Sequence, residues 1–147
     1  METWLARLEA LYQSYIQTVQ ELEKNRRIGD GLFGLRPGPA DDPCHDRFSA
    51  DLDALLKDFA ASAPDSAACA AVLRYLFSAP EAWRDLKSAY WMLIAVQGLG
   101  AGLIESLNAA DAGELAAFYA ARYPRRERLP VQTQILKKLQ RQARAAT

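Results

Sequence analysis

The sequence predicts an all-α protein, a single compact bundle of six or seven helices without a β-sheet. Apolar residues recur at three- and four-residue intervals along most of the chain, which is the period of a helix. No window shows sustained alternation of Val, Ile and Thr, and no repeat of fixed period indicates a solenoid. The 147 residues fit one domain. Unequal helices and a long first crossover favour orthogonal or mixed packing over a symmetric four-helix bundle.

The first helix is expected to run from about Glu2 to Arg27. Lys24 and Arg26 fall with Arg27 in its last turn, where cations complement the helix dipole. Gly29 is then expected to end the helix in a left-handed conformation. Large apolar residues three and four apart form one buried stripe: Trp4, Leu5, Leu8, Leu11, Tyr12, Tyr15, Ile16, Val19 and Leu22.

The next segment, residues 28–41, reads IGDGLFGLRPGPAD and has no helix or strand period. Loops of this length are usually functional or disordered. Phe33 and Leu35 would prefer to pack, so we expect at least one of them to be buried against the first two helices. If both prove exposed, they become candidate partner-binding residues together with Arg36.

Residue types that commonly begin helices predict where the middle helices start. Asp42 as N-cap with Pro43 at the first helical position begins the second helix, and the third begins near Ser62 and Pro64. The sequence Ser-Ala-Pro-Glu at residues 78–81 resembles a capping box and predicts the start of a fourth helix. A short helical piece is expected around Gly102 to Leu107.

The C-terminal helices have signals of their own. Asp111 with Glu114 predicts one helix start, and Tyr123 before Pro124 predicts its end, because the residue before proline resists the helical region. Leu129-Pro130 then begins a basic last helix of about residues 130–144.

The run from Ser88 to Ile104 contains seventeen uncharged residues, which is near the short limit of a membrane span. Gly98-Leu99-Gly100 reads as a helix stop within it, so we expect a buried core helix and no membrane partner. The chain begins with polar, amphipathic residues and without a signal-peptide pattern, which favours a cytoplasmic protein.

The one histidine, His45, lies among residue types that bind metals, in the run 41–46. On a helix, however, Cys44 joins the buried stripe of Phe48 and Leu52, and His45 lies about 100° around from it. We therefore expect a surface histidine and no metal. Cys44 and Cys69 are too isolated for a CxxC clip and are expected to be reduced core thiols. No GxSxG and no P-loop sequence is present.

Charge is distributed unevenly along the chain. Residues 1–120 hold 10 basic and 17 acidic residues, net −7, whereas residues 121–147 hold 8 basic and 1 acidic, net +7. This basic end can neutralise the acidic body, pair with the acidic face of a second copy, or bind an external anion. Few aromatic residues are interleaved with the basic ones, which argues against a base-stacking surface. The basic residues are Arg122, Arg125, Arg126, Arg128, Lys137, Lys138, Arg141 and Arg144.

These observations favour a non-enzymatic helical protein-interaction module without a cofactor, whose partner is a protein, either another chain or a second copy. The alternative is a nucleic-acid or anion binder that uses the basic C-terminal segment. A third possibility is a metal- or small-molecule-dependent enzyme near His45. The candidate partner-binding residues are Phe33, Leu35, Arg36, Arg125, Arg126, Arg128, Lys137, Lys138 and Arg141.

Overall fold

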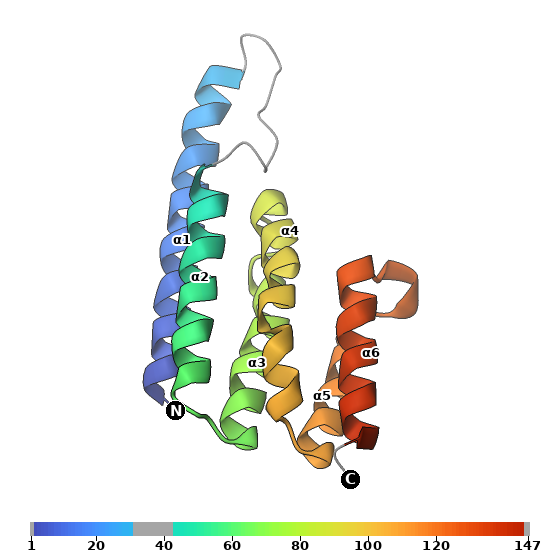
Figure 1. Ribbon diagram of the computed structural model, residues 1–147. Coiled ribbons are helices and arrows are strands. Elements are labelled where there is room, and N and C mark those ends of the chain that lie inside the picture. Colours follow the sequence, from blue (N-terminus) through green and yellow to red (C-terminus); the bar gives the residue numbers. More distant parts are fainter. Residues whose placement is uncertain (1, 31–42, 146–147) are drawn as a thin grey trace.

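The computed structural model describes residues 2–30 and 43–145, and within these ranges it contains helices and no strands (Figure 1). The expected all-α class is therefore confirmed. The elements are α1 (Glu2–Asp30), α2 (Pro43–Ala61), α3 (Ser66–Ala82), α4 (Lys87–Ala95), the 3₁₀ helix η2 (Val96–Ser106), α5 (Ala109–Arg122), the 3₁₀ turn η3 (Arg125–Glu127) and α6 (Pro130–Ala145).

The helices lie side by side in an elongated array. In Figure 1, α1 and α2 form one edge, α3, α4 and η2 occupy the middle, and α5 and α6 form the opposite edge. In this view the axes of α1, α2, α3 and α6 run in broadly one direction. The basic residues 121–147 thus come to lie at the edge formed by α5 and α6.

The hairpin of α1 and α2 follows the predicted apolar stripes. Leu8, Tyr12 and Val19 of α1 are buried against Phe48 and Leu52 of α2. The helix α1 continues to Asp30, so the expected stop at Gly29 is wrong. Glycine costs a helix only about 1 kcal/mol relative to alanine and does not by itself end one. Pro43 begins α2 as expected.

The segment 31–42 lies outside the described residues. The expected burial of Phe33 or Leu35, the role of Arg36 and the N-cap at Asp42 therefore remain predictions.

The expected start of a fourth helix at residues 78–81 is wrong, because α3 continues through Pro80 to Ala82. Proline has no N–H, so the carbonyl of Leu76, four residues earlier, loses its helical donor. The side chain of Gln97 supplies a replacement, with Nε2 3.5 Å from Leu76 O. The Ser78 hydroxyl does not cap a helix but donates to Arg74 O within α3. A tertiary contact thus allows the helix to pass a proline.

The uncharged run 88–104 is divided between α4 and η2. The α-helix ends at Ala95, just before the glycines, but the chain continues as eleven residues of 3₁₀ helix. Runs of 3₁₀ helix longer than three or four residues are uncommon. None of the helices in the described ranges is long and apolar enough to span a membrane.

The helix η2 packs against α2, α3, α4 and α6 and so occupies the centre of the array. Gly100 lies where η2 approaches α3 closely. A Cβ atom at this position would lie 2.7 Å from Cδ1 of Leu76 and 3.3 Å from Cδ2 of Leu73. The missing side chain therefore permits the close approach of the two elements.

The last two helices pack closely on each other. Asn108, and not Asp111, is the N-cap of α5, and its side chain accepts a hydrogen bond from the amide of Asp111. The predicted end at Tyr123 and the predicted start at Pro130 are confirmed. At that start, Gln132 Oε1 accepts a hydrogen bond from the Leu129 amide, which is half of a capping box.

Candidate partner-binding surface

A hollow of about 480 Å³ opens where α3, α4, α5, η3 and α6 meet. Its volume is in the range of small-molecule and side-chain sites. Trp91 of α4 lines it with 52% of its surface exposed and is one of two large hydrophobic side chains exposed in the described ranges, the other being Leu99. The lining consists of Glu81, Arg84, Tyr90, Trp91, Ile94, Arg122, Tyr123, Glu127, Leu129 and Gln132.

The wall of the hollow is held by a buried polar network beneath it. Tyr123 donates from its hydroxyl to the carbonyl of Phe77 over 2.6 Å, and it accepts from Gln97 Nε2 over 3.0 Å. Tyr119 donates to Gln97 Oε1 over 2.8 Å. These bonds join three elements, because both tyrosines belong to α5 and its C-cap, Gln97 comes from η2, and the Phe77 carbonyl belongs to α3. The network therefore fixes Tyr123 in the position from which it lines the hollow.

Burial raises the pKa of the tyrosines in and around this network. Desolvation is the largest cause for Tyr119 and for Tyr123, and it raises the pKa of Tyr75 to about 12. These phenols are therefore neutral at physiological pH, and those of Tyr119 and Tyr123 donate hydrogen bonds. They serve as structural groups and not as proton acceptors.

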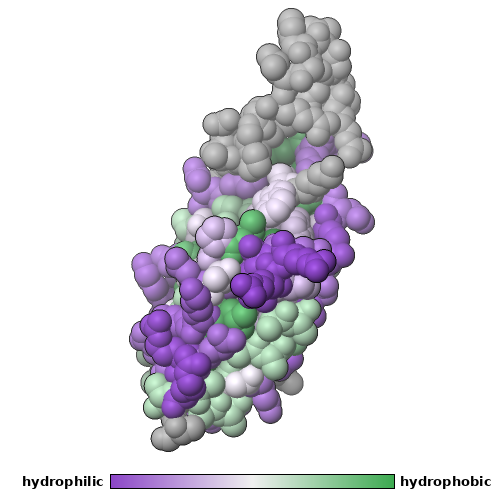
Figure 2. Space-filling view, turned by 90° about the vertical axis from the view of Figure 1, so that its right-hand side faces the viewer, coloured by the Kyte–Doolittle hydropathy of each residue, from purple (hydrophilic) through white to green (hydrophobic). Residues whose placement is uncertain are grey.

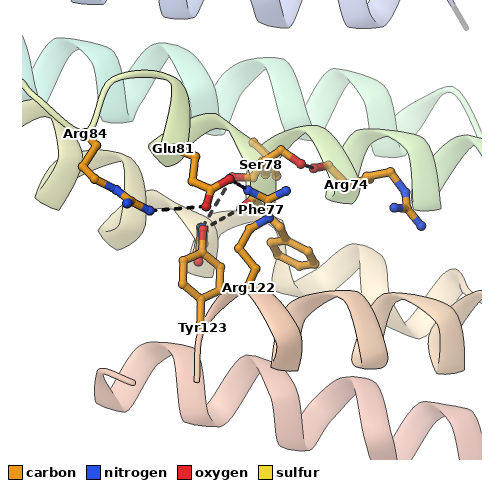
Figure 3. Close-up of polar contacts among 9 residues, drawn as sticks. Arg74, Phe77, Ser78, Glu81, Arg84, Arg122 and Tyr123 are labelled. Atoms are coloured by element: carbon orange, nitrogen blue, oxygen red, sulfur yellow. Dashed lines mark hydrogen bonds and ion pairs between the residues drawn. The ribbon is translucent and has the colours of Figure 1, made fainter. Parts of the chain in front are cut away.

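Two arginines share one carboxylate at the edge of the hollow (Figure 3). Glu81 of α3 accepts from Arg84 Nη2 at 3.3 Å through Oε1, and from Nη1 of Arg122 in α5 through Oε2. The guanidinium of Arg122 also lies over the ring of Phe118, 4.8 Å from its centroid, and Arg74 lies over the same ring at 4.5 Å. Arg122 is thus held by an ion pair and by a ring contact.

The structure divides the predicted basic residues into two groups. Arg125 and Arg126 lie exposed on η3 beside the hollow, and Arg128 follows them with Nε 3.0 Å from Tyr123 O. Lys137 and Arg141 lie exposed on α6, away from this lining.

Carboxylates of the preceding helices neutralise part of the positive charge of the basic C-terminal segment. Lys138 lies 3.6 Å from Glu105 of η2, and Arg122 pairs with Glu81 of α3. Among the described residues, no carboxylate lies within 4.0 Å of Arg125, Arg126, Lys137 or Arg141. Figure 2 faces this edge and shows hydrophilic side chains gathered around smaller hydrophobic areas. The basic end therefore keeps an unneutralised part.

Sequence reasoning did not identify Trp91, Tyr90 or Arg84 as site residues. A signal was present, because Tyr90, Leu93, Ile94 and Gln97 recur at helical spacing and Trp91 lies outside this stripe, so its large aromatic side chain is not directed into the core. The approach of α4 to the basic segment after α5 could not be read from the chain, since they are far apart in sequence.

The expectation of a surface His45 is wrong, because its side chain is only 3% exposed. Its Nδ1 lies 3.6 Å from Cys44 Sγ, and its ring meets Tyr15 edge-on at 5.7 Å. The alternating three- and four-residue spacing of Phe48, Leu52, Leu55 and Phe59 continues backwards to position 45, not to position 44.

The two cysteines differ in burial. Cys44 is half-buried and not a core residue, whereas Cys69 is fully buried, and burial raises the pKa of its thiol. Within the described ranges, no cluster of three or more His, Cys, Asp or Glu side chains is arranged to hold a metal ion.

Two further hollows have similar volumes. One of about 470 Å³ lies between α1 and α2 and is lined by Leu11, Tyr15 and Phe48 among others. The other, of about 430 Å³, lies near Trp4 and Phe59, at the turn between α2 and α3. Neither combines an exposed large aromatic side chain with two arginines, which distinguishes the hollow at Trp91.

Comparison of the chain with protein-family models, curated proteins and solved structures finds no match.

Proposed function

We propose that this chain is a non-enzymatic helical module that binds a protein partner through the hollow at Trp91. The half-exposed indole of Trp91 carries the proposal. Trp, Tyr and Arg are the residue types that most often dominate binding energy at protein interfaces, where they surround or fill a pocket. Trp91, Tyr90, Arg84 and Arg122 bring all three types to this one place.

The composition of the hollow supports binding more than catalysis. None of its lining residues is a Ser, Cys, His or Lys, so it lacks the common nucleophiles and the commonest general base. The carboxylate of Glu81 is already engaged by two guanidinium groups.

The test uses matched variants at the two exposed hydrophobic residues. Tagged wild-type protein, Trp91→Ala and Leu99→Ala are used to capture partners, and each candidate is then purified and titrated by calorimetry. A Trp at the centre of an interface contributes at least about 2 kcal/mol, so Trp91→Ala should weaken binding about 30-fold or more. Leu99→Ala should leave affinity within about threefold, the effect of a peripheral contact.

Because Trp91 is half-exposed, its replacement should change Tm little, and loss of binding would not reflect unfolding. A second copy as partner would show as concentration-dependent sedimentation that Trp91→Ala abolishes. Equal partner binding by the wild type and Trp91→Ala would contradict the proposal.

A further inference from the structure

We infer that the occupant of the hollow is an acidic segment of another protein. One apolar side chain of that segment enters beside Trp91, and a flanking carboxylate binds Arg84 and Arg122. The inference rests on the proposed function and names the chemistry of its partner.

The first argument is a surplus of cationic donors at the hollow. Each guanidinium carries five N–H donors, and both arginines share the single carboxylate of Glu81. The Nε of Arg122 is buried without a hydrogen-bond partner among the described residues. The Arg84 side chain, in contrast, is exposed, so its remaining N–H donors are open to an additional anion.

The second argument is the net charge of the surface around the hollow. The lining itself is net neutral, with Arg84 and Arg122 against Glu81 and Glu127, but three more arginines and one acid, Asp85, lie next to it in the chain, which gives a net charge of +2. Three of the arginines come from the short stretch after α5, where no carboxylate of the described residues lies within 4.0 Å of Arg125 or Arg126. The five arginines are Arg84, Arg122, Arg125, Arg126 and Arg128.

The third argument is that the internal ion pair is easily exchanged. The side chains of Arg84 and Glu81 are 66% and 46% exposed. Exposed ion pairs are worth about 0–1 kcal/mol, so a carboxylate from a partner can compete with Glu81 for Arg84 at little cost. Arg122 is only 21% exposed and stacked on Phe118, so its guanidinium is already positioned for a planar carboxylate.

The apolar part of the lining distinguishes a protein segment from a nucleic acid. Trp91 and Tyr90 contact each other edge-on at 5.5 Å, and Ile94 and Leu129 complete a surface suited to an apolar side chain. Strand binding by stacking requires successive open aromatic faces. The nearby ring of Phe118 is instead contacted by Arg74 and Arg122. An apolar anchor with flanking carboxylates matches both halves of the surface.

The experiment uses three fluorescein-labelled peptides of equal length and measures their binding by fluorescence polarisation. The first has a central Phe flanked by Asp and Glu, the second replaces the acids with Asn and Gln, and the third replaces the Phe with Ala. The first peptide should bind with a Kd of about 10–100 μM. Each of the other two should bind at least about tenfold more weakly than the first.

Protein variants then test the assigned residues. Arg84→Gln should weaken binding of the first peptide about threefold to fivefold, because it removes an exposed charge that contacts the carboxylate. Trp91→Ala should have at least the same effect. Arg47→Gln is the matched control, since it makes the same charge change at an exposed site on α2, and it should leave the Kd within about twofold.

Each other outcome overturns the inference. Equal binding of the acidic and the neutral peptide, or of the wild type and Arg84→Gln, removes the role of the carboxylate but leaves the proposed function intact. The absence of binding by any peptide at about 1 mM removes the acidic segment as the occupant. A single-stranded oligonucleotide that binds more tightly than the peptides, loses affinity steeply with salt and requires Arg84 would overturn both proposals in favour of a nucleic-acid binder.

Discussion

Replacement of Gly100 by Ala should destabilise the protein, although alanine is the better helix former. The added methyl group would lie 2.7 Å from Cδ1 of Leu76, closer than such atoms approach in proteins, and 3.3 Å from Cδ2 of Leu73. Both leucines are completely buried, so neither can turn into solvent. Leu76 also belongs to the helix turn whose carbonyl is bonded to Gln97, which limits movement of its backbone.

The size of the effect follows from two opposing contributions. Overpacking a buried site costs about 1–3 kcal/mol. Replacing glycine also restricts the unfolded chain, which stabilises the folded state by about 0.4–1 kcal/mol. Gly102 provides the control, because a Cβ there meets nothing within 4 Å. Gly102→Ala should therefore be neutral or stabilising by up to about 1 kcal/mol. The loss of glycine freedom is common to both variants, so they should differ by the overpacking cost of about 1–3 kcal/mol.

The assay is urea and thermal unfolding followed by far-ultraviolet circular dichroism. For a chain of this size, 1 kcal/mol corresponds to a Tm change of about 2–4 °C, so the difference is measurable. A Gly100→Ala variant as stable as Gly102→Ala would refute the close approach of η2 to α3.

Four further predictions concern the core, Phe33 and the histidine. Tyr123→Phe removes the donor to the Phe77 carbonyl and should cost about 1–3 kcal/mol in urea unfolding; an unchanged midpoint would contradict the network. Stability should be complete below pH 10 and fall above it, because Tyr12 and Tyr75 have raised pKa values in the folded state and the unfolded chain loses these protons first; a free energy of unfolding that stays constant between about pH 9 and 12 would contradict this. Phe33→Ala should lower Tm if that side chain packs on α1 and α2, whereas an unchanged Tm with weaker partner binding would assign it to an interface. Elemental analysis should find well under about one equivalent of zinc, iron or manganese, and a stoichiometric metal lost in His45→Ala would contradict the absence of a metal site.

Helical periodicity predicted the class, and the residues of most buried stripes, because burial of one face is a local property of the sequence. Neighbouring residues also predicted the start of α6 at Pro130 and the end of α5 at Tyr123, because proline directly restricts the backbone of the residue before it. The same rule failed at Pro80. There the helix lacks the N–H of Pro80, and the side chain of Gln97, seventeen residues further along, donates to the Leu76 carbonyl instead. A partner so distant in the chain cannot be predicted from the local sequence.

The candidate site was less accessible to sequence reasoning. The basic half was visible as a cluster that contains Arg125 and Arg126, because those residues are neighbours in the chain. The aromatic half, with Trp91, comes from α4 and joins the arginines only through the packing of α3 and α5. His45 was misplaced for a simpler reason, since the three- and four-residue alternation was extended to the wrong one of two adjacent positions.

The central claim is that this chain acts by holding a protein against Trp91. Site-specific photo-crosslinking tests it most directly, with a benzophenone amino acid placed at position 91 in one variant and at position 99 in another. Both positions are exposed in the described part of the protein, so both variants should fold. The predicted result is one discrete crosslinked protein species that forms from position 91 and not from position 99. Equal crosslinking from both positions, no crosslink from position 91, or a crosslink to nucleic acid would contradict the claim.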